Sequence, residues 1–206
     1  MLNQGAEATV TPCTFLNVPC LSKRRLPKTY RNHALDAKLR RSRTKLEAKA
    51  MHRAKTSGTS CPLVLNVDLQ KCEIIQTKLP GVSLTEFIRT ASDKNTEIVL
   101  RAAGVQLAKL HSAGLSHGDS TTSNFIAHGK KVFIFDFGLS SFDPSLEEQA
   151  TDLLLFSKSV SPAQFKNFLT GYTGERGLET TKALLALVTE IQLRARYVER
   201  YSKSQK

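Results

Sequence analysis

Two short polar motifs in the second half of this chain constrain its fold more than any other feature. The first is the stretch 117–124, with the sequence HGDSTTSN, and the second is Asp136-Phe137-Gly138. Asp119 and Asn124 are five residues apart on one predicted loop, so both side chains can face the same point in space. Asp136 ends the apolar run 132–135, which is typical of a strand. The three side chains are suited to binding the phosphates of a nucleoside triphosphate together with magnesium ions.

The chemistry of each group suggests a role for it. Asp119 is predicted to orient, or accept a proton from, the attacking hydroxyl or water. Asn124 and Asp136 are predicted magnesium ligands, whereas His117 is predicted to hold the loop structurally. In this order and spacing the motifs indicate kinase-like phosphoryl transfer. Either motif alone could instead be an ordinary turn, since Asp and Asn are common in turns and helix caps.

A kinase-like site also needs a lysine for the phosphates and a glutamate to orient that lysine. The spacing favours Lys23, which follows an apolar stretch, although Arg24 and Arg25 adjoin it. Glu47 is predicted to pair with Lys23; the alternative is that an acid in so basic a segment only relieves local repulsion. Gly5 is predicted to let the backbone approach the phosphates, but the usual glycine-rich pattern is absent.

The positive charge of the chain is concentrated in one segment. The formal net charge is +12, and residues 23–55 hold thirteen Lys or Arg against two acids. Such a segment favours a polyanionic partner, RNA in particular, unless it is only a solvated helix surface. The four cysteines lack metal-binding spacing, and no apolar run is long enough to cross a bilayer. We therefore expect a protein of the cytoplasm or nucleus, without membrane contact and with reduced thiols.

The periodicity of the sequence predicts an α+β fold with two lobes. Residues 1–80 are predicted as a small strand-rich N-lobe with one long helix, and residues 81–206 as a helical C-lobe. The N-lobe helix 35–54 is expected to bury Leu35, Leu39, Leu46 and Ala50. The predicted N-lobe strands are 8–10, 15–21, 63–68 and 73–77. The predicted C-lobe elements are helices 84–89, 96–112, 145–159, 163–172 and 178–196, the strand 131–135 and a mobile tail 203–206.

Several stretches together resemble one known family, the small atypical kinase/ATPase subunit of the KEOPS (EKC) complex, also called the PRPK family. They are QGAEA (4–8), KRRLPKTYR (23–31), RTKLEA (43–48), HGDSTTSN (117–124) and DFGLS (136–140). The resemblance implies a minimal protein-kinase-like fold, with ATP and Mg²⁺ as cofactors. It also implies that Asp152 is similar to the buried aspartate that braces the catalytic loop.

The same resemblance implies an ATPase or Ser/Thr kinase that supports threonylcarbamoyladenosine formation in tRNA. Its partners would be the threonylcarbamoyl-transferase subunit and the other KEOPS subunits. The chain departs from the family pattern at Thr29, at Asn32-His33, at Gln76 and Lys78 in the predicted hinge, and at Ser120, where leucine is usual. Two alternatives stay open, a small-molecule phosphotransferase of the aminoglycoside or choline kinase type and a non-catalytic tRNA-binding scaffold subunit.

Overall fold

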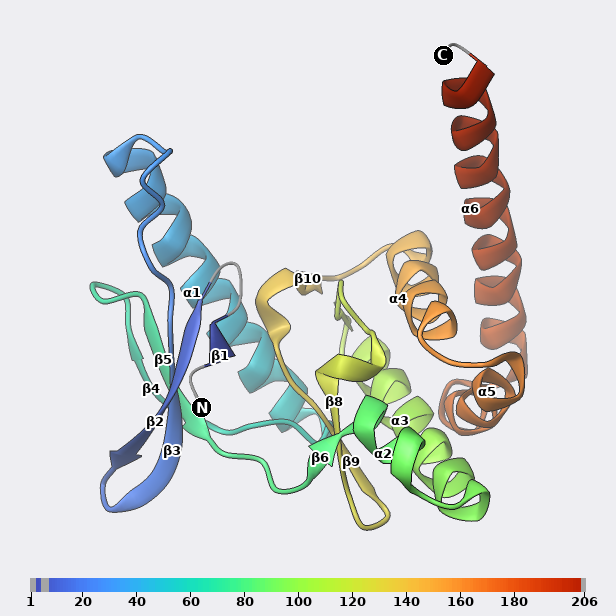
Figure 1. The fold of residues 1–206 in the computed structure, drawn as a ribbon, viewed down its shortest axis with the longest axis horizontal. Helices are drawn as coiled ribbons and strands as arrows, with labels where there is room; N and C mark the ends of the chain where they lie inside the picture. The colour runs from blue at the N-terminus through green and yellow to red at the C-terminus, as the bar shows by residue number, and fades with distance from the viewer. Residues whose placement is uncertain (1–2, 5–7, 205–206) are drawn as a thin grey trace.

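A computed structural model describes residues 3–4 and 8–204, with side chains for 8–195. It consists of an antiparallel sheet with one long helix, followed by a largely helical part (Figure 1). The α+β organisation predicted from the sequence is therefore confirmed. Among the described residues, no helix combines the length and the apolar character that crossing a bilayer requires.

The amino-terminal sheet has five antiparallel strands in the order β1-β2-β3-β5-β4. The strands are β1 (Asn3–Gln4), β2 (Thr9–Phe15), β3 (Val18–Arg24), β4 (Val64–Asp68) and β5 (Glu73–Thr77). Helix α1 (His33–Thr56) connects β3 to β4 and packs against β4 and β5. The side chain of Asn32 caps its first turn by accepting hydrogen bonds from the backbone N–H groups of Ala34 and Leu35.

The predicted single strand 15–21 is wrong, because the chain reverses within it. Leu16 and Asn17 have φ values of 49° and 63° and form a two-residue turn, so that Phe15 pairs with Val18. Two consecutive left-handed residues match the twist of a hairpin, and asparagine tolerates this conformation better than most residues. The turn aligns β2 and β3 over seven residue pairs and so sets the position of Lys23.

The predicted apolar face of α1 is also wrong. Leu35 and Leu46 are 53% and 46% exposed, whereas Glu47 is only 2% exposed. Of the four residues expected to be buried, only Ala50 is fully buried. The helix turns Glu47 and small side chains inward, because the Glu47 carboxylate pairs with Lys23 and Arg25 of the sheet segment.

The carboxyl-terminal part is built on five helices. They are α2 (Leu84–Thr90), α3 (Asp93–Ser112), α4 (Leu146–Lys158), α5 (Pro162–Arg176) and α6 (Leu178–Ser204). Figure 1 shows α6 extending beyond the other helices. The helix predicted to end at 196 thus continues through Ser204, into the segment expected to be a mobile tail.

The segments between these helices contain short strands and 3₁₀ turns. Strands β6 (Val82–Ser83), β8 (Phe125–His128) and β9 (Lys131–Ile134) form a small sheet, and β7 (Leu115–Ser116) pairs with β10 (Ser141–Phe142). Two 3₁₀ turns, η1 (Thr122–Asn124) and η2 (Phe137–Leu139), contain parts of the polar motifs. Beneath them lies an apolar core in which Phe156 stacks on Phe168 with ring centroids 3.8 Å apart.

Helices α3 and α5 cross with their backbones in close approach because a glycine lies at the contact on each helix. A Cβ on Gly104 would lie 2.0 Å from the carbonyl oxygen of Phe168, and one on Gly171 would lie 1.9 Å from that of Arg101. Even a methyl group at either position would push the two helices apart. This crossing is part of the support beneath the polar loops.

We therefore predict that Gly171→Ala destabilises the protein by about 1–3 kcal/mol through overpacking. The matched control is Gly174→Ala in the same helix, where an added Cβ would meet nothing within 4 Å. That control should raise the stability by about 0.5–1 kcal/mol, the difference in helix propensity between glycine and alanine. Urea unfolding of both variants measures the effect, and equal stabilities would contradict the close crossing.

Candidate functional site

A hairpin brings the two polar motifs together. Strands β8 and β9 pair antiparallel, with Phe125 opposite Ile134. The N–H of Phe135 donates to the carbonyl oxygen of Asn124 over 3.1 Å, which continues the pairing by one residue. Asp136 follows immediately. Two residues that are twelve positions apart in the sequence therefore lie at the same end of one hairpin.

The first motif forms a closed loop around the side chain of Asn124. Its Nδ2 atom donates to the backbone oxygen of Asp119 over 2.7 Å and to Asp119 Oδ2 over 2.9 Å. The amide nitrogen is thereby oriented toward Asp119, and the amide oxygen faces away from it. The loop thus fixes the Asp119 carboxylate and presents an amide oxygen beside it.

The second motif contacts the amino-terminal sheet through Lys23. Lys23 Nζ lies 2.5 Å from Glu47 Oε1 and 2.7 Å from Asp136 Oδ1. The lysine is on β3, the glutamate on α1, and the aspartate follows β9. The pair predicted from sequence between Lys23 and Glu47 is present, and Asp136 joins it. Nucleotide binding by these three groups stays a prediction.

The charges in this cluster shift the pKa values of its members in opposite directions. Burial by itself lowers the pKa of Lys23, but the carboxylates of Glu47 and Asp136 outweigh it and hold the pKa above its ordinary value. Burial raises the pKa of Asp136, but Lys23 outweighs it and holds that pKa below the usual range. Both groups are therefore charged at neutral pH.

The backbone around the site adopts conformations that only certain residues tolerate. Asp136 is left-handed, with φ 63° and ψ 70°, a conformation that aspartate adopts more readily than most residues. Gly118 has φ 78°, and a Cβ there would lie 2.3 Å from the carbonyl oxygen of Leu139. Glycine at position 118 thus lets the two motif loops touch.

A buried carboxylate braces the first motif from below. Asp152, on α4, is fully buried and accepts hydrogen bonds from the N–H of His117 at 2.7 Å and of Gly118 at 2.9 Å. Ser120 Oγ donates to the backbone oxygen of Asp152 over 2.5 Å. The bracing role implied for Asp152 is thus present in the structure. The unusual Ser120 is accommodated, because its hydroxyl has a partner.

Histidine side chains complete this support, and one of them was missed by sequence reasoning. His111 Nε2 lies 3.0 Å from Asp152 Oδ2, and His111 Nδ1 lies 2.7 Å from the hydroxyl of Tyr172. His117 Nε2 donates to the carbonyl oxygen of Phe135 over 3.0 Å, in agreement with its predicted structural role. His111 carried no motif signal; only its place on the buried face of α3 could have suggested it.

The ligand atoms available at the site suit magnesium. Among the described residues, no group of three or more His, Cys, Asp or Glu side chains could hold a metal ion. Magnesium does not require such a group, because it commonly takes one or two protein oxygens and completes its shell with water and phosphate oxygens. The Asn124 amide oxygen and the Asp136 carboxylate, which is 47% exposed, are ligands of this kind.

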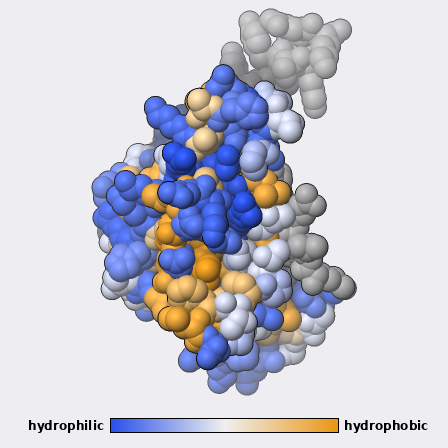
Figure 2. Space-filling model, turned by 90° about the vertical axis from the view of Figure 1, so that its left-hand side faces the viewer, coloured by the Kyte–Doolittle hydropathy of each residue, from blue (hydrophilic) through white to orange (hydrophobic). Residues whose placement is uncertain are grey.

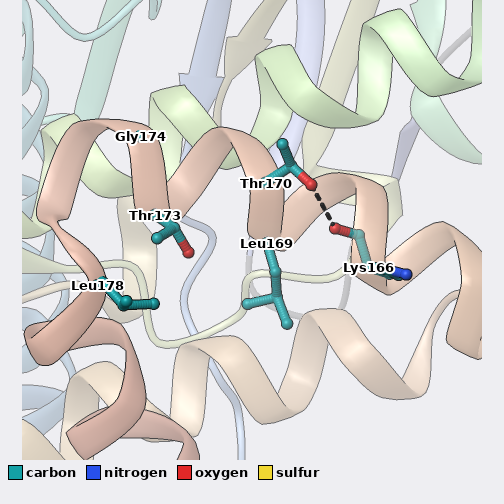
Figure 3. Close-up of a pocket in the computed structure, with 6 residues that line it drawn as sticks. All are labelled: Lys166, Leu169, Thr170, Thr173, Gly174 and Leu178. Atoms are coloured by element: carbon teal, nitrogen blue, oxygen red, sulfur yellow. Dashed lines mark hydrogen bonds between the residues drawn. The ribbon is translucent and has the colours of Figure 1, made fainter.

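Two further residues singled out in the sequence are Gly5 and Gln76. Gly5 falls outside the described residues. Gln76 is buried in β5, opposite Leu21. A separate open pocket between α5 and α6 contains none of the predicted site residues (Figure 3). It is lined by Lys166, Leu169, Thr170, Thr173, Gly174 and Leu178.

The basic segment divides into bound and solvent-facing cations. Arg40 donates to Asp36 over 2.6 Å and is therefore tied to the structure. Arg41, Lys45 and Lys49 are exposed at successive i, i+4 positions of α1. Figure 2, which views the side with the amino-terminal sheet, shows hydrophilic side chains above a hydrophobic patch. A positive stripe on α1 is thus available for contact with a polyanion.

Comparison with known proteins places the chain in a family. No protein-family model matches it. The KEOPS complex subunit Bud32 of Pyrococcus abyssi is 36% identical over an alignment of 213 positions, which covers 97% of both chains. A probable serine/threonine-protein kinase BUD32 homolog of Archaeoglobus fulgidus is 36% identical, over 87% of this chain and 89% of the relative. The chain belongs to the Bud32 family. The resemblance inferred from its motifs is confirmed.

Some members of the Bud32 family are longer proteins. In Methanobrevibacter smithii, a probable bifunctional tRNA threonylcarbamoyladenosine biosynthesis protein is 36% identical over 96% of this chain. The match covers only 36% of that relative, so the chain spans about a third of its length.

A solved structure supports the same fold class. WaaP in complex with acyl carrier protein has a TM-score of 0.66 over 95% of this chain and 87% of its own. At 15% identity this likeness shows the fold alone. The predicted kinase-like α+β fold is thereby confirmed, and the division into lobes at residues 80 and 81 stays a prediction.

The buried His111 predicts a specific pH dependence of stability. Burial holds its pKa below the ordinary 6.5, with the Asp152 contact opposing that shift only in part. The unfolded chain therefore binds a proton that the folded chain excludes, and the free energy of unfolding should fall as the pH drops from 7 to 5. Asp152 titrates in a separate range, because its pKa is held below 3.8.

Urea unfolding at pH 7, 6 and 5 checks this prediction. The His111→Gln variant should be less stable at pH 7 but lose this part of the pH dependence. His128→Gln, which replaces an exposed histidine at the end of β8, should keep the wild-type slope. An unchanged slope in the His111 variant would show that the imidazole is not neutral in the fold.

Proposed function

We propose that this chain is the ATP-dependent kinase or ATPase subunit of a KEOPS-type complex that supports threonylcarbamoyladenosine formation in tRNA. The names of its relatives connect the family with this complex, with this modification and with serine/threonine kinases. The observation that carries the proposal is the position of Lys23 Nζ between Glu47 and Asp136. Asp136 in turn lies at the same end of the β8–β9 hairpin as the Asp119–Asn124 loop. Phosphoryl transfer by a kinase-like fold uses these groups in this arrangement.

Each residue has a defined task in the proposed reaction. Lys23 binds phosphate oxygens of ATP, and Glu47 keeps the lysine in place. Asn124 and Asp136 hold magnesium, which when bound neutralises charge on the phosphate oxygens. Asp119 orients the attacking water or hydroxyl group, and its hydrogen bond from Asn124 fixes the direction of its carboxylate.

The proposal extends to the parts of the chain that surround the site. The nucleotide lies between residues 1–80 and residues 81–206, which act as the two lobes of a kinase. Gly5 approaches the phosphates from the N-lobe, which stays a prediction because this residue lies outside the described residues. The other KEOPS subunits, the threonylcarbamoyl-transferase subunit among them, are the proposed protein partners, in the cytoplasm or nucleus.

The test of the reaction is ATP turnover in the presence of the transferase partner and tRNA. Asp119→Ala should lower the rate at least about a hundredfold, as expected for loss of a positioned acid–base group. Asp136→Asn should also abolish turnover, because an amide replaces the charged metal ligand. The matched control is Asp143→Asn, at another left-handed aspartate (φ 50°) that is 79% exposed.

The two alternative functions give different results in the same assay. A scaffold subunit would show no ATP turnover even in the wild type. A small-molecule phosphotransferase would turn over ATP without the partner or tRNA and would depend on a small hydroxyl-bearing or amine-bearing acceptor. Wild-type turnover by Asp119→Ala would contradict the mechanism itself.

The exposed basic stripe of α1 gives a second prediction, on tRNA. Replacing Arg41, Lys45 and Lys49 by glutamine should weaken tRNA binding and flatten its dependence on salt, because fewer counterions are released. The control replaces Lys130 and Lys131, which are exposed on the β8–β9 hairpin. Fluorescence anisotropy between 50 and about 200 mM salt measures both effects. Equal salt slopes in both variants would show that the stripe does not contact tRNA and is only a solvated surface of the helix.

A further inference from the structure

The inward glutamate of α1 is bound by two cations, one on each oxygen. Lys23 Nζ lies 2.5 Å from Oε1, and Arg25 Nη2 lies 2.6 Å from Oε2. Both cations come from one short segment, because Arg25 directly follows β3. Sequence reasoning considered Arg25 only as a competitor of Lys23 for the same role. The structure gives the two residues different positions on the same carboxylate.

Burial makes the second cation important. The Glu47 side chain is 2% exposed and that of Arg25 is 6% exposed. Lys23 is shared between the carboxylates of Glu47 and Asp136. With Arg25 included, these four groups have two positive and two negative charges. Without it, two carboxylates would share a single lysine, and a buried carboxylate without sufficient positive charge strongly destabilises a fold.

Arg25 also lies beside the second polar motif. A Cβ on Gly138 would lie 3.1 Å from Arg25 Nη2 and 3.8 Å from Glu47 Oε2. Turn η2, which contains Gly138 and packs against α1, is therefore next to the Arg25–Glu47 pair. Helix α1, the end of β3 and turn η2 meet at this guanidinium. A planar, permanently charged guanidinium suits such a contact better than an ammonium group does.

In the proposed reaction Arg25 has a role beyond compensating the buried charge of Glu47. Bound phosphates would draw on the charge of Lys23, and bound magnesium would be held by Asp136. Glu47 would then need another partner to keep its charge compensated and its direction fixed. Arg25 on Oε2 would be that partner and would keep Glu47 within reach of the lysine.

We propose that Arg25 is a positioning residue that holds Glu47, and through it Lys23, in the geometry that binds ATP. This inference rests on the proposed phosphoryl-transfer function and deepens it. In this role Arg25 acts through Glu47, whose Oε2 it binds. It makes the inward position of α1 a fixed property of the fold, because the helix is tied to both β3 and η2.

A double-mutant cycle between Arg25→Met and Glu47→Gln, in the full chain, tests the proposal. Arg25→Met should raise the KM for ATP by about tenfold or more, the range that loss of an orienting partner typically costs. In the Glu47→Gln background the same change should have a much smaller effect, because the two residues act as one unit. Arg25→Lys should restore part of the affinity, because it keeps the charge.

An exposed pair of the same kind provides the matched control. Arg101 Nη2 lies 2.6 Å from Glu97 Oε1 on α3, with side chains 50% and 44% exposed. Arg101→Met and Glu97→Gln should leave KM and kcat at wild-type values and show no coupling, because water compensates both charges. Melting temperatures of all variants separate loss of fold from loss of nucleotide affinity.

Two outcomes would overturn the proposal. The first is additive effects of Arg25→Met and Glu47→Gln on KM. The second is an unchanged KM in Arg25→Met, which together with a lower melting temperature would make Arg25 purely structural. If the wild type fails to bind ATP, the proposed function fails instead. Hydrogen exchange of the α1 amides then decides the role of Arg25, and unchanged exchange in Arg25→Met would exclude it.

Discussion

The functional architecture depends on one buried carboxylate. Glu47 is almost fully removed from water, so its charge has to be compensated by groups of the protein itself. Lys23 and Arg25 supply that compensation from the end of β3, and Lys23 also forms an ion pair with Asp136. This requirement explains why α1 turns a charged face inward and leaves Leu35 and Leu46 half exposed. Helix α1, strand β3 and the turn that contains Asp136 are positioned by the same set of charges.

The second half of the site depends on another buried carboxylate, Asp152. It accepts two backbone hydrogen bonds from the start of the 117–124 loop and one from His111. Because α4 carries this aspartate and α3 carries the histidine, the packing of the helices fixes the loop. The close crossing of α3 and α5 places Tyr172 on the far side of the histidine. The loop that holds Asp119 is thus held by hydrogen bonds with residues outside the two motifs.

Local sequence was sufficient for a large part of the fold and of the candidate site. The five-residue spacing of Asp119 and Asn124 predicted one loop, and the apolar run before Asp136 predicted β9. Capping residues marked the starts of α2 and α4 within one residue. The hairpin turn at Leu16 and Asn17 was missed because its sequence lacks glycine, the usual signal of two left-handed residues. His111 was missed because nothing in its immediate neighbourhood distinguishes it from other core histidines. Arg25 lies in the family-like stretch 23–31 but was considered only as an alternative to Lys23.

The sequence by itself determined the chemical groups, their local spacing and the family, since motifs of adjacent residues need no knowledge of distant contacts. Only the tertiary structure decided which face of α1 is buried and which cation meets which oxygen of Glu47. The physical reason is that burial and charge compensation are set by segments far apart in the chain. Lys23 and Asp136 meet although they are 113 residues apart, and no local pattern shows that Asp136 and Arg25 join the predicted pair of Lys23 and Glu47.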